Sequence, residues 1–214
     1  LLNGQREVFE MIAVGAPLRE TLDALLRLIE GQSPDLLCSV LLLDPDGVHL
    51  RHGAAPSLPE SFIRTADGLA IGPSVGSCGT AVFRREPVIV EDIATDPLWE
   101  GARELAGAHG LQACWSTPIF DAQQHVLGSF AIYYRTVARP NERHQQLIDV
   151  ATHTAAVAIS KQQQEEALRE SELRHRLLGE IIVSFAFAYR VHPDRRVELE
   201  WATEPIQDVI GYTE

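Results

Sequence analysis

A thiol in a glycine-rich stretch is the feature of this sequence best suited to chemistry. Cys78 stands in the run Gly76-Ser-Cys-Gly, at the predicted start of a short helix. The backbone dipoles of a helix N-terminus stabilise nearby negative charge, so they lower the pKa of a thiol placed there. Such a thiol could serve in redox sensing, in covalent attachment of a ligand or in catalysis. The same pattern also fits a small apolar residue buried in the core, a common use of free cysteine.

Four further candidate side chains alternate along a predicted strand over residues 111–120. Cys114 and Ser116 share one face of this strand, and Trp115 and Thr117 share the other. Successive side chains of a strand point to opposite faces of a sheet. One pair should therefore meet a ligand pocket while the other meets packed helices, and the sequence does not decide which.

The loops from 76 to 117 hold the remaining candidates for a small-molecule pocket. Such pockets combine apolar and aromatic walls with a few polar groups. Each candidate also fits a plain structural role, with the indoles filling the core and Asp92 capping a loop. The candidate ligand-binding residues are Cys78, Thr80, Asp92, Trp99, Cys114, Trp115, Ser116 and Thr117.

Neither the cysteines nor the histidines predict a metal site. Cys38, Cys78 and Cys114 are odd in number and widely spaced, so they form neither a disulfide framework nor a metal-binding knuckle. None of the eight histidines has a partner at metal-ligand spacing. We therefore expect a reducing compartment and no metal, and the sequence names no cofactor.

Charge and hydropathy exclude several classes of partner. The chain of 214 residues carries a formal net charge of −12, which repels nucleic-acid backbones and anionic lipid. No apolar run approaches the roughly 20 residues that span a bilayer, so we expect no direct membrane insertion. The first ten residues lack the basic start and apolar stretch of a signal peptide, so a cytoplasmic location is expected.

The hydrophobic pattern predicts an α+β fold that positions these residues. The stretch 126–134 is apolar on both faces, which is typical of a central strand covered by helices on both sides of a sheet. Asp96 before Pro97 predicts a capped helix that ends near Gly110. The other predicted elements are two helices within 5–30, a hairpin over 38–52, a short helix near 59–66, a strand from 87 and a strand over 111–120.

A long helix is predicted from residue 141 to residue 180. Its length would be about 60 Å at 1.5 Å per residue, more than a small domain can bury. Leu168, Leu173 and Leu177 continue the apolar stripe beyond a polar break, which favours a parallel homodimeric coiled coil over an exposed linker helix. Beyond residue 180 the pattern alternates, which predicts a hairpin and then a helix over 204–211.

The order of these elements resembles the GAF domain family over about residues 5–165. Local patterns of the family are similar to Val75-Gly-Ser-Cys-Gly-Thr-Ala, Pro87-Val-Ile-Val-Glu-Asp-Ile, Ser116-Thr-Pro-Ile and Val126-Leu-Gly-Ser-Phe-Ala. The tail, with Trp201-Ala-Thr-Glu-Pro and Ile210-Gly-Tyr-Thr-Glu, resembles the opening of a PAS domain. The resemblance implies a GAF-like sensor domain over 1–160, a connecting coiled-coil helix over 161–180 and a partial PAS-like α/β segment over 181–214.

The resemblance implies a regulatory module rather than an enzyme. A GAF pocket would bind a small molecule or respond to redox state, and a dimeric helix would pass the change onward. The dimer would form through the N-terminal helix and the 141–180 helix. The implied context is a cyclic-di-GMP turnover enzyme or a histidine kinase, with a catalytic output domain beyond residue 214. Two alternatives stay open: a free methionine sulfoxide reductase that uses Cys78, and a dimerisation scaffold without a ligand.

Overall fold

The computed structural model of the chain describes residues 2–182, 187–192 and 195–202. The chain divides into two units, Leu1–Gln163 and Gln164–Glu214, which we describe separately. Helix α6 (Glu142–Ile182) is continuous across the boundary between them.

An antiparallel sheet of six strands organises the first unit. The strand order is β3-β2-β1-β6-β5-β4, so β6 is central, as its apolar sequence predicted. All residues of β6 except the first are buried. The strands are β1 (Leu36–Leu43), β2 (His49–Ala54), β3 (Leu69–Ala70), β4 (Val88–Val90), β5 (Ala113–Phe120) and β6 (Val126–Tyr134).

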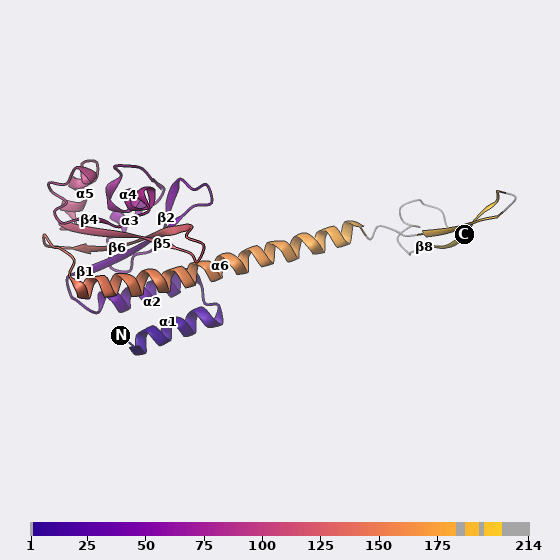
Figure 1. Ribbon diagram of the computed structural model, residues 1–214, viewed down its shortest axis with the longest axis horizontal. Helices are drawn as coiled ribbons and strands as arrows, with labels where there is room; N and C mark the ends of the chain where they lie inside the picture. Colours follow the sequence, from indigo (N-terminus) through magenta and orange to yellow (C-terminus); the bar gives the residue numbers. More distant parts are fainter. Residues whose placement is uncertain (1, 183–186, 193–194, 203–214) are drawn as a thin grey trace. The chain divides into compact units, whose positions relative to one another are not determined.

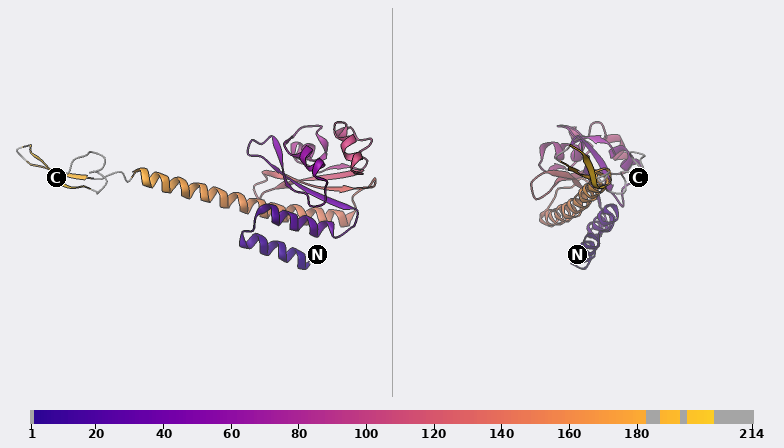
Figure 2. Two further views of the ribbon diagram at one scale, coloured as in Figure 1. Left: turned by 180° about the vertical axis from the view of Figure 1, so that it is seen from behind. Right: turned by 90° about the vertical axis from the view of Figure 1, so that its right-hand side faces the viewer.

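Helices cover both faces of this sheet, which confirms the predicted α+β class (Figures 1 and 2). One face carries α2 (Leu18–Glu30) and the first turns of α6, and α1 (Leu2–Val14) packs outside α2. The other face carries α3 (Glu60–Ala66), α4 (Gly76–Arg84), the short 3-10 helix η1 (Pro97–Trp99) and α5 (Arg103–Ala108). Two hydrophobic cores result, one on each side of the sheet.

The alternation along β5 separates the candidate residues between these cores. Cys114 belongs to the core beneath α4 and α5, whereas Trp115 belongs to the core beneath α2 and α6. On the neighbouring strand β6, Tyr133 and Tyr134 divide in the same way. The question that the sequence left open is thereby answered: Cys114 faces the side of the short helices.

The helix predicted from residue 97 to residue 110 is interrupted. Asp96 caps its start as predicted, because its carboxylate accepts a hydrogen bond of 2.8 Å from the Leu98 N–H. The chain then leaves helical geometry at Ala102, where φ is −126°. Gly101 has low helix propensity, and the buried indole of Trp99 is fixed by a hydrogen bond to Ser77. These two features favour a turn over a continuous helix.

In the second unit, the described residues form the rest of α6 and a hairpin. Strands β7 (Phe187–Val191) and β8 (Val197–Ala202) pair in antiparallel fashion, as the alternating pattern predicted. The helix predicted over residues 204–211 lies outside the described residues. Within the described parts of both units, no helix has the length and apolar character required to cross a membrane.

The first turn of α6 is fixed to the sheet by a histidine. The Asn141 N–H donates to His144 Nδ1 at 3.1 Å, and the His144 N–H donates to the Asn141 side-chain oxygen at 3.0 Å. This is a reciprocal capping box with histidine at the third helical position. Because Nδ1 accepts, we assign the ring proton to Nε2, which lies 2.9 Å from the Tyr134 hydroxyl. The imidazole also lies 5.0 Å from the Trp115 ring.

We predict that this anchor weakens as the pH falls. Burial and the nearby Arg143 cation lower the pKa of His144 below its usual value of 6.5. The folded state therefore favours neutral His144. The stabilisation of the fold by this anchor is complete above pH 6.5 and is lost as the pH falls below that value. A proton on Nδ1 removes the cap, which is typically worth about 1 kcal/mol. Urea unfolding at pH 7 and pH 5 measures the loss.

The matched variant for this test is His144→Gln. Glutamine is a usual partner in a capping box and does not titrate, so it keeps the cap at both pH values. The wild-type chain should lose more unfolding free energy between pH 7 and pH 5 than the variant does. Equal losses in the two proteins would contradict the assigned role of His144.

The close approach of β1 and β6 depends on Gly128. A Cβ atom at this position would lie 2.1 Å from the Leu41 carbonyl oxygen, so the backbone would have to move. We predict that Gly128→Ala lowers the free energy of unfolding by about 2–3 kcal/mol, as overpacking in a core typically does. Gly107→Ala is the control, because its Cβ would have no neighbour within 4 Å and α5 should gain helix propensity. Comparable losses in both variants would contradict this account.

Candidate functional site

A cavity of about 300 Å³ lies on the sheet face that carries the short helices. Its walls come from α3, from the loop that enters α4, and from the η1–α5 segment. Its floor includes Leu41 of β1 and Tyr133 of β6. The lining residues are Leu41, Phe62, Thr65, Ala66, Leu69, Ser74, Val75, Gly76, Ser77, Cys78, Leu98, Trp99, Gly101, Ala102, Leu105 and Tyr133.

A chain of hydrogen bonds connects one wall of the cavity to the sheet. The Trp99 indole N–H donates to the Ser77 hydroxyl at 2.9 Å. That hydroxyl in turn donates to the Cys114 carbonyl oxygen at 3.3 Å. Ser77 is fully buried, so both of these bonds are made away from water. The indole is thereby held against the first turn of α4 by a satisfied buried network.

Cys78 lies over a group of buried hydroxyls. Its sulfur lies 3.2 Å from Ser116 Oγ and 3.8 Å from the Tyr133 hydroxyl oxygen. Ser116 Oγ also lies 3.7 Å from the sulfur of Cys114, and the Tyr133 hydroxyl lies 3.4 Å from Ser39 Oγ. The two thiols therefore meet at one shared serine, and only Cys78 lines the cavity.

These contacts move the thiol pKa values in opposite directions. Hydrogen bonds from the side chains of Cys114, Ser116 and Tyr133 outweigh burial at Cys78 and lower its pKa to about 7. Burial raises the pKa of Cys114 well above its usual value, and the neighbouring Cys78 adds to the rise. Burial likewise raises the pKa of Tyr133. Cys78 is therefore the thiol of this pair that forms a thiolate near neutral pH.

Contacts between α3 and its neighbours hold the cavity walls together. The Phe62 ring packs edge-on against the Tyr133 ring at 5.6 Å. Beside it, the Ser61 hydroxyl and His109 Nε2 lie 3.0 Å apart and join α3 to the end of α5. His109, at the end of α5, thus has a structural partner.

The structure brings four of the eight candidate residues together. Cys78 and Trp99 line the cavity, and Cys114 and Ser116 lie directly behind Cys78. These four residues share one polar network with Ser77.

The other four candidates lie elsewhere. Trp115 and Thr117 alternate with Cys114 and Ser116 and therefore point to the opposite face of the sheet. The Thr80 hydroxyl accepts a hydrogen bond from the Val75 N–H at 3.0 Å, so it holds the loop before α4. Asp92 accepts hydrogen bonds from the Ala94 N–H at 3.0 Å and the Thr95 hydroxyl at 2.9 Å, which caps a loop.

Sequence reasoning missed several lining residues. Tyr133 and Phe62 both belong to predicted elements, and the signal for Tyr133 was its place in a strand expected to be buried on both faces. The pattern marked 126–134 as apolar on both faces, but it did not show that a hydroxyl from this strand would reach Cys78. Ala102 and Leu105 line the cavity because the chain leaves helical geometry after η1. The sequence predicted one continuous helix here and therefore did not predict this lining.

A second cavity, of about 420 Å³, lies beside the loop of Asp92. In contrast to the first cavity, charged side chains line it, namely Asp92 and Arg103. The Arg103 guanidinium donates to the carbonyl oxygens of Asp96 at 3.1 Å and Ile93 at 3.4 Å. Its charge therefore serves to hold the loop around η1.

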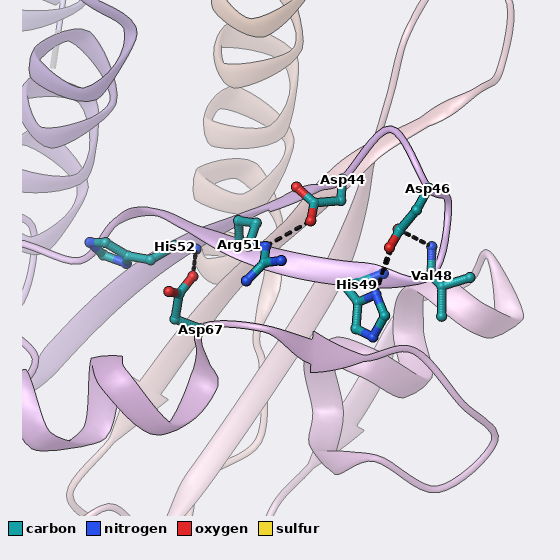
Figure 3. A network of polar contacts seen from close by, with 7 residues as sticks. All are labelled: Asp44, Asp46, Val48, His49, Arg51, His52 and Asp67. Atoms are coloured by element: carbon teal, nitrogen blue, oxygen red, sulfur yellow. Dashed lines mark hydrogen bonds and ion pairs between the residues drawn. The ribbon is translucent and has the colours of Figure 1, made fainter.

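A separate polar cluster occupies the hairpin of β1 and β2, and its contacts shape the backbone there (Figure 3). Asp46 accepts hydrogen bonds from the backbone N–H groups of Val48 at 2.8 Å and His49 at 3.0 Å. Arg51 of β2 donates to Asp44, the residue that follows β1, at 2.7 Å. Each carboxylate is thus engaged in shaping the turn. Within the described residues, no group of three or more histidine, cysteine or acidic side chains could hold a metal ion.

Comparison with known proteins gives a consistent picture of the fold. The family described as GAF domain matches residues 15–160. The methyl sulfide methyltransferase-associated sensor of Methanosarcina acetivorans is 40% identical over 178 residues, which is 83% of this chain. The chain spans 18% of the length of that curated relative.

Two solved structures illustrate the structural likeness. The GAF domain of a phosphoenolpyruvate-protein phosphotransferase from Coxiella burnetii matches with a TM-score of 0.62 and 19% identity, covering 78% of this chain and 96% of that one. The free methionine-R-sulfoxide reductase of Neisseria meningitidis, in complex with its substrate, matches with a TM-score of 0.59 and 13% identity. That match covers 75% of this chain and 89% of the reductase. At these identities the likeness concerns the fold.

The arrangement around Cys78 predicts selective alkylation. Iodoacetamide reacts with thiolates, so the rate at Cys78 should rise with pH and reach its midpoint near pH 7. Cys38 and Cys114 have raised pKa values and are fully buried, so they should stay unmodified under the same conditions. Mass spectrometry of peptides after short pulses between pH 5 and pH 9 measures all three sites.

Ser116→Ala supplies the matched variant. It removes one hydrogen bond to the Cys78 sulfur and should raise the midpoint, while leaving Cys38 unaffected on the other face of the sheet. A midpoint of 9 or more for Cys78 in the wild-type chain would contradict the proposed role of the hydroxyl cluster.

Proposed function

The chain belongs to the GAF domain family, and from this premise we propose that the cavity beside Cys78 is the ligand site of a sensory module in a signalling protein. The observation that carries the proposal is the position of the cavity. It lies on one face of the sheet, directly opposite the face that anchors the first turn of α6. The sensor from Methanosarcina acetivorans, which resembles most of this chain, supports the same interpretation.

Two pairs of consecutive residues support a path from the cavity to α6. On β5, the Cys114 carbonyl accepts the hydrogen bond from Ser77, and the next residue, Trp115, donates its indole N–H to the Ala138 carbonyl at 3.2 Å. On β6, Tyr133 lines the cavity. The following residue, Tyr134, contacts His144 in the first turn of α6, as described above.

These pairs lie side by side in the sheet. Cys114 is opposite Tyr133, and Ala113 is opposite Tyr134. A shift of Trp99 or Cys78 on binding would therefore act on the same short segment of the paired strands β5 and β6. We propose that this segment moves the start of α6, as small shifts at an effector site do when they act on a packed helix.

The finer parts of the proposal follow the family resemblance. The input would be a small molecule or, through the Cys78 thiol, the redox state. The output would pass through a homodimer formed by α1 and α6 to a PAS-like segment over 181–214. Downstream would lie a cyclic-di-GMP turnover enzyme or a histidine kinase. Exposed apolar side chains support the dimer: Phe9 and Val14 on α1 in the first unit, and Leu168 and Leu173 on α6 in the second.

The reductase alternative rests on the meeting of Cys78 and Cys114 at Ser116. Its free amino-acid substrate carries both an ammonium and a carboxylate group, and each would need a partner in a buried site. The residues that line the cavity offer no charged side chain for either group. We therefore favour the sensor, and turnover of free methionine sulfoxide that is lost in Cys78→Ser would favour the reductase.

We predict that filling the cavity abolishes the response to small molecules. Compounds or cell-extract fractions that bind should raise the melting temperature of the wild-type chain by a few degrees, through mass action. Ala102→Leu places a larger side chain at the cavity wall and should remove the rise. Ala108→Leu, at the exposed end of α5, should keep it. Thermal unfolding of the three proteins in parallel measures the effect.

Hydrogen exchange provides the second measurement. A binding compound should change the protection of residues 142–150 in the wild-type chain and in Ala108→Leu. A rise in melting temperature that persists in Ala102→Leu would show binding elsewhere and would contradict the site. A chain that responds to no compound or extract would instead behave as the ligand-free scaffold.

A further inference from the structure

The cavity beside Cys78 is lined without charge. Among the residues that form its walls and floor, none is lysine, arginine, histidine, aspartate or glutamate. Transfer of an isolated charge from water into a buried apolar site costs far more than transfer of a neutral polar group. A charged ligand would therefore find no side chain here to offset its loss of hydration.

Most polar side chains in the lining are already paired with the protein. The Ser77 hydroxyl donates to the Cys114 carbonyl and accepts from Trp99, so both groups are engaged. The Thr65 hydroxyl donates to the Ser61 carbonyl at 3.1 Å. The Tyr133 hydroxyl lies within hydrogen-bonding reach of Ser39 and Cys78. A ligand rich in hydrogen-bonding groups would have to break these bonds or leave its own groups unpaired.

The remaining surface of the cavity is apolar or aromatic. Phe62, Trp99 and Leu105 supply much of it, from α3, η1 and α5 respectively. A cavity of about 150 Å³ lined by apolar side chains is sufficient to hold benzene. The present cavity, at about 300 Å³, has roughly twice that volume and suits a molecule of about 10 to 15 non-hydrogen atoms.

We propose that this cavity binds an uncharged, mainly apolar small molecule of one or two rings, or of equivalent bulk, and discriminates against ions and zwitterions. The proposal rests on the proposed function of the cavity as a ligand site and adds the chemical class of the ligand. Selectivity arises because the indole of Trp99 and the hydroxyls of Ser77 and Tyr133 are held by the protein itself.

The second cavity, beside Arg103, provides an internal contrast. Its lining includes the charged side chains of Asp92 and Arg103. The other lining residues come from the loop after β4, from α5 and from the loop before β5. Charged compounds that bind the chain weakly would be expected there. A test must therefore locate each compound as well as measure its affinity.

Three indole compounds of nearly the same shape test the proposal on the full chain. Tryptophol is neutral, indole-3-acetate is an anion and tryptamine is a cation at pH 7. Each is titrated into isotope-labelled protein, and amide shifts report both affinity and location. Tryptophol should bind at least about tenfold more tightly than either ion, since an unpaired buried charge is costly. Its shifts should centre on residues 62–66, 74–78 and 98–105.

Two variants and one further probe make the outcomes distinct. Ala102→Leu should weaken tryptophol at least about tenfold, and Ala108→Leu should leave its affinity unchanged. Benzene tests whether any apolar molecule enters the cavity. If benzene binds there and an ion binds as tightly as tryptophol at the same residues, the ligand class is overturned while the proposed function stands. If neither benzene nor any indole compound shifts these residues, both proposals are overturned.

Discussion

The pairing of β5 with β6 is the constraint on which the rest of the structure depends. Both strands lie in the interior of the sheet and are buried on both faces, so each pair of consecutive side chains must be divided between two cores. Cys114 and Tyr133 belong to the cavity side, while Trp115 and Tyr134 belong to the side of α6. Because a strand has a period of two, no residue can change sides without a shift of register that would reverse all of them.

The same constraint explains why a polar group is tolerated below the cavity. Buried hydroxyls and thiols lose hydration, and they are stable only when they satisfy one another. Cys78, Ser116 and Tyr133 come from three separate elements, and the Cys78 sulfur lies 3.2 Å from the Ser116 hydroxyl and 3.8 Å from the Tyr133 hydroxyl. Hydrogen bonding from Cys114, with that from Ser116 and Tyr133, lowers the pKa of Cys78, and the same contacts hold α4 against the sheet. The lowered pKa of Cys78 and the packing of α4 on the sheet therefore depend on the same contacts.

Much of this arrangement could be predicted from the sequence, and the reasons for the rest are physical. The apolar stretch 126–134 identified the central strand, and the glycine-rich run around Cys78 marked the start of α4. Alternation along 111–120 separated Cys114 from Trp115, but it could not assign their sides, because that depends on which helices cover each face. The lining contributed by α5 depends on the interruption after Trp99, which is stabilised by a tertiary hydrogen bond to Ser77. Helix propensity depends on the local sequence, so it does not predict an interruption that a tertiary contact stabilises.

Energetic coupling across the sheet sets a scale for the proposed sensor. A ligand can shift an equilibrium only by the difference in its affinity for the two states. Coupling energies between distant sites are typically about 1–3 kcal/mol. The capping box of Asn141 and His144 is worth about 1 kcal/mol by comparison with other helix caps, which is the same order. A ligand therefore need not deform the sheet as a whole, because a small displacement of Tyr134 would weaken its contact with His144 in the first turn of α6. We propose that the sheet stays rigid in this response while the start of α6 changes its anchorage at His144.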